Sequence, residues 1–313
     1  MADVDRLIAA ARTGSPRAIG RLISAVENVS AQLPMIMKAL APSTGRCYVI
    51  GLTGAPGVGK STTTSMLVRA LRGKGQRVGV LAVDPSSPFS GGALLGDRVR
   101  MQEHALDDGT YIRSMATRGH LGGLSVAAPQ ALRVFDAAGF DVVLVETVGV
   151  GQSEVEIAGV ADITLVLIAP GMGDGIQAAK AGILEVGDVF VVNKSDRDGT
   201  QALIRELRTM IGLADRTAET WKPPIVTTVA YQGQGIDELL AAVERFRGHQ
   251  SATGAGTARR VARSRREIEN IALSKLRAEF PLSGQAGLGD LAVAVSRGEL
   301  DPYAAAEQII GGM

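Results

Sequence analysis

A glycine-rich loop set between a predicted strand and a predicted helix is the feature that most constrains how this chain folds. Residues 54–61 read GAPGVGKS and match the pattern G-x-x-x-x-G-K-[ST] at every fixed position. The apolar run Tyr48–Leu52 predicts a buried strand before the loop, and Thr62–Leu71 predicts a helix after it. Glycines in such a loop let backbone N–H groups face phosphate oxygens, and the helix N-terminus favours negative charge. The sequence therefore predicts a binding site for a nucleoside triphosphate.

The last two residues of this loop are expected to contact the phosphates and the metal ion. We expect Lys60 to reach the β- and γ-phosphates as a catalytic cation, and Ser61 to place its hydroxyl on Mg²⁺. The residues expected to contact the nucleotide here are Gly54, Ala55, Pro56, Gly57, Val58, Gly59, Lys60, Ser61 and Thr62.

Strand and helix patterns alternate from the loop to about residue 230. Near-continuous apolar runs are typical of parallel strands covered on both faces, and they occur at Val78–Val83, Val142–Val145, Ile163–Ile168, Val189–Val192 and Ile225–Val229. This alternation predicts an α/β fold with a mostly parallel, doubly wound sheet, whose ligand lies at the carboxyl ends of the strands.

Helical patterns flank this region on both sides. Residues 3–40 read as short helices, one of them starting at Ser15-Pro16, and 258–280 and 301–310 read as later helices. The polar stretch 248–257 is interpreted as a linker. We predict an N-terminal helical extension at 1–42, the nucleotide domain at 43–247 and a C-terminal arm at 248–313. An apolar stripe predicts that this arm self-associates; it comprises Ile268, Ile271, Ala272, Leu276 and Phe280.

The motif N-K-x-D at 193–196 follows a buried strand and indicates guanine as the base. The Asp196 carboxylate can accept from both N1–H and the C2 amine of guanine, whereas adenine has neither donor. Asn193 would brace the loop and reach the base, and the stem of Lys194 would lie along the purine face. Backbone groups of Val229 and Ala230, after the last strand, are expected near the guanine O6. These features predict GTP and GDP as ligands and a sheet of the P-loop GTPase type.

Three acids follow strands or loops that lead toward the phosphates. Glu146 opens E-T-V-G, a variant of the D-x-x-G motif in which a carboxylate holds a Mg²⁺ water and Gly149 senses the γ-phosphate. Asp84 ends another strand pattern, and we expect Asp84 and Glu146 to be catalytic as well as metal-binding. Asp97 is a further Mg²⁺ candidate, with a turn or helix cap as its competing role.

Two features suggest slow, regulated hydrolysis. Val150 follows the E-T-V-G glycine, where small GTPases place the glutamine that orients water. The loop at 169–177 holds three glycines in five residues, and a switch and an ordinary strand-to-helix turn both fit it.

The charge balance and the cysteine content indicate which partners and which compartment to expect. The 33 Lys and Arg residues balance 32 Asp and Glu residues, so no basic stripe for nucleic acid is indicated. Cys47 is the single cysteine, which favours a reducing compartment, and neither a leader peptide nor a membrane span is evident in the sequence. We expect a cytoplasmic protein that binds neither nucleic acid nor membrane.

These motifs together resemble the MeaB/ArgK family of GTPases, associated with methylmalonyl-CoA mutase. The likeness spans most of the chain and rests on GAPGVGKST (54–62), VDPSSPFSGGALLGDRVRM (83–101), MATRGHLGGLS (115–125), ETVGVGQSE (146–154), APGMGDGIQ (169–177), NKSD (193–196) and DPYAAAEQII (301–310). The resemblance implies a homodimer and a GTP-dependent chaperone of the adenosylcobalamin-dependent mutase. Such a chaperone gates cofactor loading from the adenosyltransferase and protects the mutase from inactivation. It also implies that Lys60, Ser61, Asp84, Asp97 and Glu146 form the phosphate and Mg²⁺ centre, and that 169–177 communicates with the mutase.

Other functions remain open at this stage. The ArgK name carries an older meaning, a kinase or ATPase linked to amino-acid transport, against which Asp196 argues because it selects guanine. A metal-insertion GTPase would concentrate Cys and His near the nucleotide, whereas Cys47, His104, His120 and His249 are scattered in this sequence. A signalling module in which nucleotide merely stabilises a dimer is the fourth alternative.

Overall fold

The computed structural model describes residues 2–84, 101–104, 106–116, 124–147, 156–171, 183–213, 220–279 and 287–311. Contacts between Cα atoms group the chain into two compact units, Met1–Arg263 and Ser264–Met313. None of the helices within the described ranges is long and apolar enough to cross a membrane.

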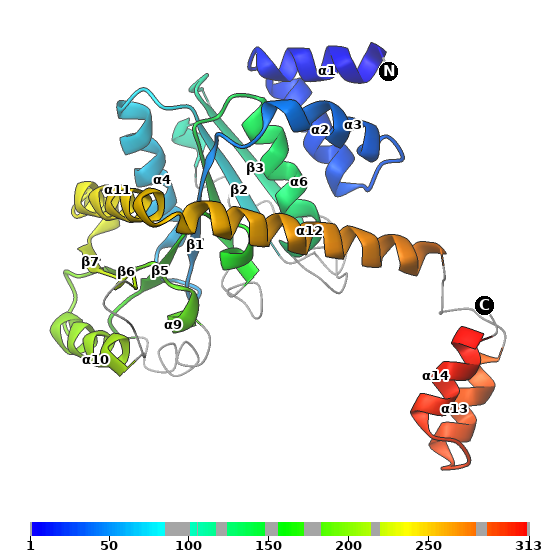
Figure 1. Ribbon diagram of the computed structural model, residues 1–313. Helices are drawn as coiled ribbons and strands as arrows, with labels where there is room; N and C mark the ends of the chain where they lie inside the picture. The colour runs from blue at the N-terminus through cyan, green and yellow to red at the C-terminus, as the bar shows by residue number, and fades with distance from the viewer. Residues whose placement is uncertain are drawn as a thin grey trace. The chain divides into compact units, whose positions relative to one another are not determined.

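Seven parallel strands form the sheet of the first unit, in the order β3-β2-β4-β1-β5-β6-β7 (Figure 1). The strands are β1 (Tyr48–Thr53), β2 (Val78–Asp84), β3 (Thr110–Ala116), β4 (Val142–Thr147), β5 (Ile163–Ile168), β6 (Val189–Asn193) and β7 (Ile225–Thr228). Because the strands are parallel, their carboxyl ends share one edge, and the segment 54–59 leaves the central strand β1 there.

Helices cover both faces of the sheet, which confirms the predicted doubly wound α/β class (Figure 1). Ile50 and Leu52 of β1 pack toward α4 (Lys60–Gly73) and α11 (Ile236–Thr253), whereas Val49 packs toward the opposite layer. That opposite layer contains α1 (Ala2–Arg12), α2 (Pro16–Glu27), α3 (Leu33–Leu40) and α6 (Leu124–Ala137), and α10 (Thr200–Leu213) packs on β5 and β6. The alternation along β1 thus follows from the two-residue period of a strand.

The predicted N-terminal helices are present. Ser15 is the N-cap of α2 with Pro16 as first residue, and its hydroxyl accepts from the Ala18 N–H at 3.4 Å. The apolar face of α2 is buried within the core that it shares with α1, α3 and α6; it comprises Ala18, Ile19, Leu22, Ile23 and Val26.

The remaining elements are short or lie near the C-terminus. They are α9 (Ile183–Val186), the 3-10 turns η1 (Ala41–Ser43), η2 (Gln102–His104), η3 (Ile157–Gly159) and η4 (Ala230–Gln232), and the helices α12 (Ala255–Glu279), α13 (Leu288–Ser296) and α14 (Pro302–Gly311).

The interpretation of 248–257 as a linker is wrong. Helix α11 continues to Thr253 and α12 begins at Ala255, so the only interruption is Gly254, whose φ of 73° ends α11 as a left-handed cap. Ser251, Ala252 and Thr253 lie on an exposed helix surface, whereas Gln250 is buried and donates to the Asp162 carbonyl.

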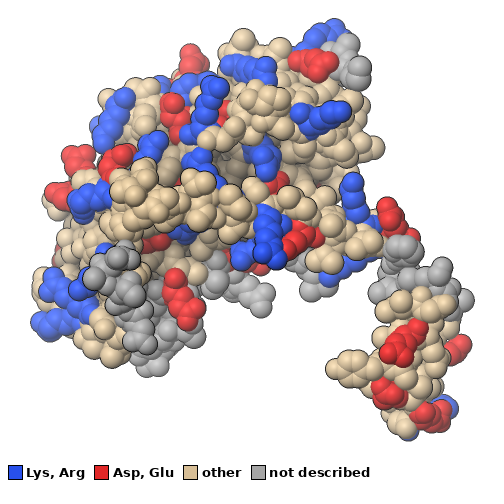
Figure 2. Space-filling view, viewed as in Figure 1, with Lys and Arg blue, Asp and Glu red and all other residues tan. Residues whose placement is uncertain are grey.

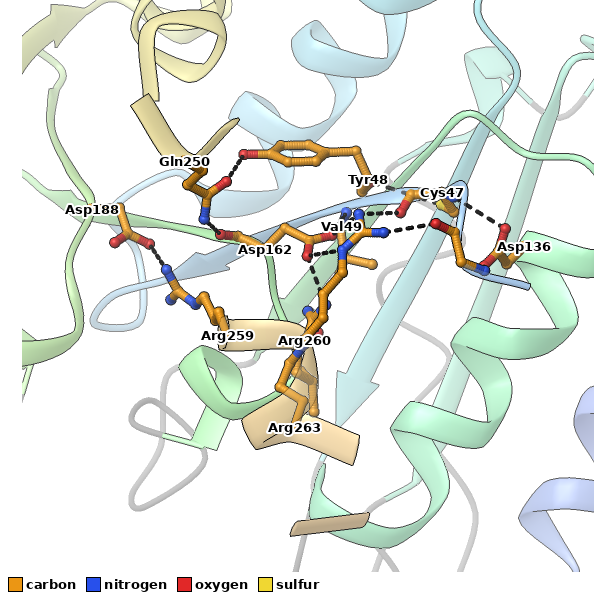
Figure 3. A network of polar contacts seen from close by, with 12 residues as sticks. Cys47, Tyr48, Val49, Asp136, Asp162, Asp188, Gln250, Arg259, Arg260 and Arg263 are labelled. Carbon is orange, nitrogen blue, oxygen red and sulfur yellow. Dashed lines mark hydrogen bonds and ion pairs between the residues drawn. The ribbon is translucent and has the colours of Figure 1, made fainter. Parts of the chain in front are cut away.

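Three arginines at the start of α12 bind the amino-end edge of the sheet (Figure 3). Arg263 donates to the Asp162 carboxylate at 2.6 Å and to the Val160 carbonyl at 2.6 Å. Arg260 donates to the same carboxylate at 3.2 Å and to the Gly45 carbonyl at 2.7 Å. We call the set Arg259, Arg260, Arg263, Asp162 and Asp188 the arginine clamp.

Both carboxylates of the clamp also hold backbone amides, Asp162 as a buried residue and Asp188 as a partly buried one. Asp162 is 3% exposed and accepts from the Val49 N–H at 2.9 Å, and Asp188 pairs with Arg259 at 2.9 Å and accepts from the Thr164 N–H at 2.7 Å. Burial raises the pKa of the Asp188 carboxyl, and the charge of Arg259 opposes that shift. The clamp therefore holds the starts of β1, β5 and β6, the strands that lead to 54–61, 169–171 and 193–196.

Surface charges show no single-sign field on the side seen in Figure 2. Basic and acidic side chains of the first unit are interspersed there.

The single cysteine is buried in the first unit. Burial raises the pKa of the Cys47 thiol far above its usual value, so this cysteine stays protonated at neutral pH.

Candidate nucleotide site

The phosphate-binding loop is shaped by glycines that no other residue could replace. Gly54 has φ of 140°, and a Cβ there would lie 2.2 Å from the Leu167 carbonyl oxygen of β5. Gly59 has φ of 99°, and a Cβ there would lie 2.3 Å from Nδ2 of Asn193. Both positions combine positive φ with close contact, so the loop can approach β5 and the carboxyl end of β6.

Lys60 lies inside the curve of this loop. It is 6% exposed, and its Nζ donates to the Gly54 carbonyl at 2.6 Å and to the Ala55 carbonyl at 3.1 Å. Gly57 and Pro56 complete the turn, and Thr62 lies on the exposed side of α4. The loop thus holds a buried ammonium group at the N-terminus of α4, where the helix dipole also attracts anions.

Glu146 and Ser61 meet directly. Glu146 is the next-to-last residue of β4, beside β1, and is 4% exposed; Ser61 Oγ donates to its Oε1 at 2.6 Å. Thr64, one turn along α4, donates to Oε2 at 2.8 Å. Sequence reasoning missed Thr64, although its spacing of three residues from Ser61 places both hydroxyls on one side of the helix.

The oxygen atoms of Ser61 and Glu146 are the hard donors that Mg²⁺ prefers, so the residues present fit that ion. Ser61 would bind it directly and Glu146 would bind it or its water, and the ion would neutralise phosphate charge. No group of three or more His, Cys, Asp or Glu side chains gathers for a metal within the described ranges. Mg²⁺ in nucleotide sites takes its remaining oxygens from phosphate and water.

Several predicted residues cannot be placed in full. Asp84 is the last residue of β2, the strand beside β4, but its side chain lies outside the described part of the chain. Asp97, Gly149 and Val150 lie outside the described residues, as do positions 172–177 of the glycine-rich loop.

The N-K-x-D segment is joined to the phosphate-binding loop. Asn193 Nδ2 donates to the Val58 carbonyl at 2.8 Å, and Lys194 Nζ donates to the Gly57 carbonyl at 2.7 Å. Lys194 has φ of 56°, a left-handed conformation that is uncommon for a residue with a side chain. The structure therefore brings the phosphate and base motifs into one site.

The segment after β7 closes this end of the site. Asn193 Oδ1 accepts from the Thr228 hydroxyl at 3.0 Å and from the Ala230 N–H at 3.1 Å. The Val229 N–H donates to the Gln234 carbonyl at 3.1 Å, so a contact between either amide and a guanine O6 would require these bonds to be exchanged. Sequence reasoning missed Thr228 and the side chain of Tyr231, whose hydroxyl donates to Asp196 Oδ2 at 3.3 Å.

Fold and site together define a P-loop nucleotide-binding protein of the guanine-reading class. A family model described as "Methylmalonyl Co-A mutase-associated GTPase MeaB" matches residues 19–283. The chain belongs to this family of GTPases, and its enzymatic activity is the hydrolysis of GTP.

Individual relatives agree with this assignment. A protein of Pyrococcus horikoshii that carries a provisional GTPase name is 43% identical and aligns over 99% of this chain and 98% of its own length. The GTPase ArgK of Escherichia coli is 40% identical over 70% of this chain and 67% of its own. The mouse protein named methylmalonic aciduria type A homolog, mitochondrial, is 39% identical over 68% of this chain and 52% of its own.

A solved structure shows the same fold across the chain. The crystal structure of LAO/AO transport system kinase has a TM-score of 0.73 and 28% identity, and the match covers 99% of this chain and 97% of that one.

Proposed function

We propose that this GTPase assists an adenosylcobalamin-dependent methylmalonyl-CoA mutase, by gating cofactor loading from the adenosyltransferase and by protecting the mutase from inactivation. The observation that carries the proposal is the family match over residues 19–283, since that family is described by its association with the mutase. The mouse relative named for methylmalonic aciduria type A supports the same metabolic setting.

The site residues have distinct roles in this proposal. Lys60 holds the β- and γ-phosphates, Ser61 with Glu146 and Asp84 orients the Mg²⁺ end of the nucleotide, and Asp196 selects guanine. Asp97 adds a further carboxylate to the Mg²⁺ end, and Gly149 senses the γ-phosphate. Mg²⁺ supplies charge neutralisation when bound.

Slow hydrolysis without a partner suits a switch. Val150 cannot orient water through its side chain, so the missing group comes from the mutase or from a loop that the mutase reorders. We place that response in the loop 169–177, which leaves β5 close to Gly54. A partner that distinguishes the GTP-bound from the GDP-bound form must in turn alter nucleotide affinity.

The kinase alternative has a specific weakness. The carboxylate of Asp196 would meet the acceptor N1 of adenine rather than a donor, which costs affinity for ATP. The word kinase in the name of the solved relative describes that protein. Among the described residues, the site contains no feature that requires a phosphate acceptor other than water.

Turnover of GTP with and without purified methylmalonyl-CoA mutase tests the proposal. We expect the mutase to raise the turnover of the wild type, and the double variant Asp174→Ala/Gln177→Ala to respond less while keeping its intrinsic rate. An unchanged rate in the presence of the mutase would refute the proposed partner. A double variant that is stimulated as strongly as the wild type would refute only the choice of loop.

A further inference from the structure

An exposed tyrosine lies against the carboxylate that reads guanine. Tyr231 belongs to η4, which begins shortly after β7, and it is 64% exposed. Its hydroxyl donates to Asp196 Oδ2 at 3.3 Å. The N-K-x-D pattern does not include this residue.

The direction of this hydrogen bond follows from the carboxylate, which can only accept, and a second contact is compatible with it. Gln232 Nε2 donates to the Tyr231 hydroxyl oxygen at 2.6 Å, which occupies an acceptor site of that oxygen. The hydroxyl proton is therefore available to Asp196, and Gln232, Tyr231 and Asp196 form a short chain in which each group donates to the next.

The two loops that carry this chain are held together independently of it. Asn193 and Thr228 are partners in the β6–β7 register, the Ser195 N–H donates to the Thr228 carbonyl at 3.1 Å, and the Thr228 hydroxyl donates to Asn193. Tyr231 and Asp196 therefore start from fixed backbone positions, and removal of the tyrosine hydroxyl should leave the loops in place.

We propose that Tyr231 is a positioning residue that determines base specificity by fixing the orientation of the Asp196 carboxylate. This inference rests on the proposed reading of guanine by Asp196. An exposed aspartate rotates about two side-chain bonds, and a single donor such as N1–H can be met in several orientations. Two adjacent donors, N1–H and the C2 amine, require both carboxylate oxygens to lie near the plane of the base. The tyrosine therefore matters most for ligands with two donors.

Comparison of GTP with inosine triphosphate isolates this effect, because inosine lacks only the C2 amine. The dissociation constants are measured by displacement of a fluorescent GDP analogue from the full-length protein, for the wild type, Tyr231→Phe and Tyr303→Phe. The last variant is a matched control, since Tyr303 is 85% exposed on α14 in the other unit.

We expect the wild type to prefer GTP over inosine triphosphate by about tenfold or more, the value of a hydrogen bond to a charged group. Tyr231→Phe should reduce that preference by roughly three- to tenfold through weaker GTP binding, with inosine triphosphate affected less than about twofold. Tyr303→Phe should match the wild type.

Three results would overturn the inference. An unchanged preference in Tyr231→Phe would mean that the hydroxyl does not orient Asp196. Tighter GTP binding by that variant would mean that the hydroxyl competes with the base. A wild type that binds ATP, inosine triphosphate and GTP equally would overturn the guanine assignment itself, and the inference with it.

Discussion

Glu146 is the residue on which the catalytic half of the site depends. Its buried carboxylate accepts from Ser61 and Thr64 of the helix that begins at the phosphate-binding loop. A glutamine keeps the shape but loses the charge that orients Mg²⁺ and its water, and these interactions matter most in the transition state. We predict that Glu146→Gln lowers kcat for GTP by about 10²-fold while GDP affinity in EDTA stays within about threefold.

The matched control for this prediction is Thr64→Ser, which keeps the hydroxyl bonded to the carboxylate and should retain nearly full turnover. Removal of Mg²⁺ by EDTA should abolish turnover in the wild type. An unchanged kcat in Glu146→Gln would assign Glu146 a structural role.

A substitution of Asp196 tests which base the site binds, because it changes one atom of the side chain that is proposed to contact the base. Asparagine presents an amide donor where the carboxylate accepted, which opposes the guanine amine and suits the C2 carbonyl of xanthine. Asp196→Asn should therefore weaken GTP and favour xanthosine triphosphate, as measured by competition binding. Asp198→Asn, an exposed change two residues along, is the control and should bind as the wild type does. Equal loss for both nucleotides would show that Asp196 does not contact the base.

Helix α12 carries two ion pairs that differ in burial, and burial decides how much each contributes to the free energy of unfolding. Arg263 and Asp162 are 19% and 4% exposed at their side chains, whereas Arg265 and Glu269 on the same helix are 81% and 55% exposed. Loss of a partner from a buried pair costs much more than loss of a solvated one. We predict that Arg263→Ala lowers the free energy of unfolding by about 2 kcal/mol, and Arg265→Ala by less than about 0.5 kcal/mol.

Urea denaturation monitored by tryptophan fluorescence is suited to this comparison. Trp221 is the single tryptophan of the chain, and its indole Nε1 donates to the Asp188 carbonyl at 2.8 Å, within the clamp. Equal destabilisation by the two arginine variants would show that the clamp adds nothing beyond an exposed pair.

The strands of the sheet differ in how readily they can be predicted from the sequence. The strand 163–168, which is covered on both faces, was predicted with its bounds because all its residues except the β-branched Thr164 are apolar. Strand β3 was missed because it lies at the sheet edge, where Arg113 and Ser114 interrupt the apolar run, although Thr110, Tyr111 and Ile112 favour a strand.

Motifs with fixed spacing located the candidate site, but its internal contacts depend on tertiary structure. The spacing of 54–61 and 193–196 identified both halves of the site, whereas the bonds of Thr64 to Glu146 and Tyr231 to Asp196 join residues 82 and 35 positions apart. Pairings over such separations are set by the strand order, which no local pattern encodes.

For the whole molecule, we propose that the chain forms a dimer through its second unit. Several apolar side chains of α12 and α14 are exposed, among them Ile268 at 68%, Leu276 at 51% and Ile310 at 66%. We predict that the full-length protein is a dimer by light scattering, and that a chain ending at residue 266 is a monomer that still binds GTP. This end point keeps the arginine clamp, whereas an end at Gly254 would remove it and lower stability. A dimer that survives loss of residues 267–313 would place the interface on the first unit.

We propose that one site, built from 54–61, Glu146 and 193–196, binds and hydrolyses GTP. The most direct test is steady-state phosphate release from GTP and from ATP by the wild type and by Lys60→Ala, with the thermal midpoint of each protein measured in parallel. Lys60 supplies the buried cation for the β- and γ-phosphates, so we predict release from GTP well above release from ATP, and loss of both in a variant that remains folded. Equal release from ATP and GTP, or full turnover by Lys60→Ala, would contradict the account.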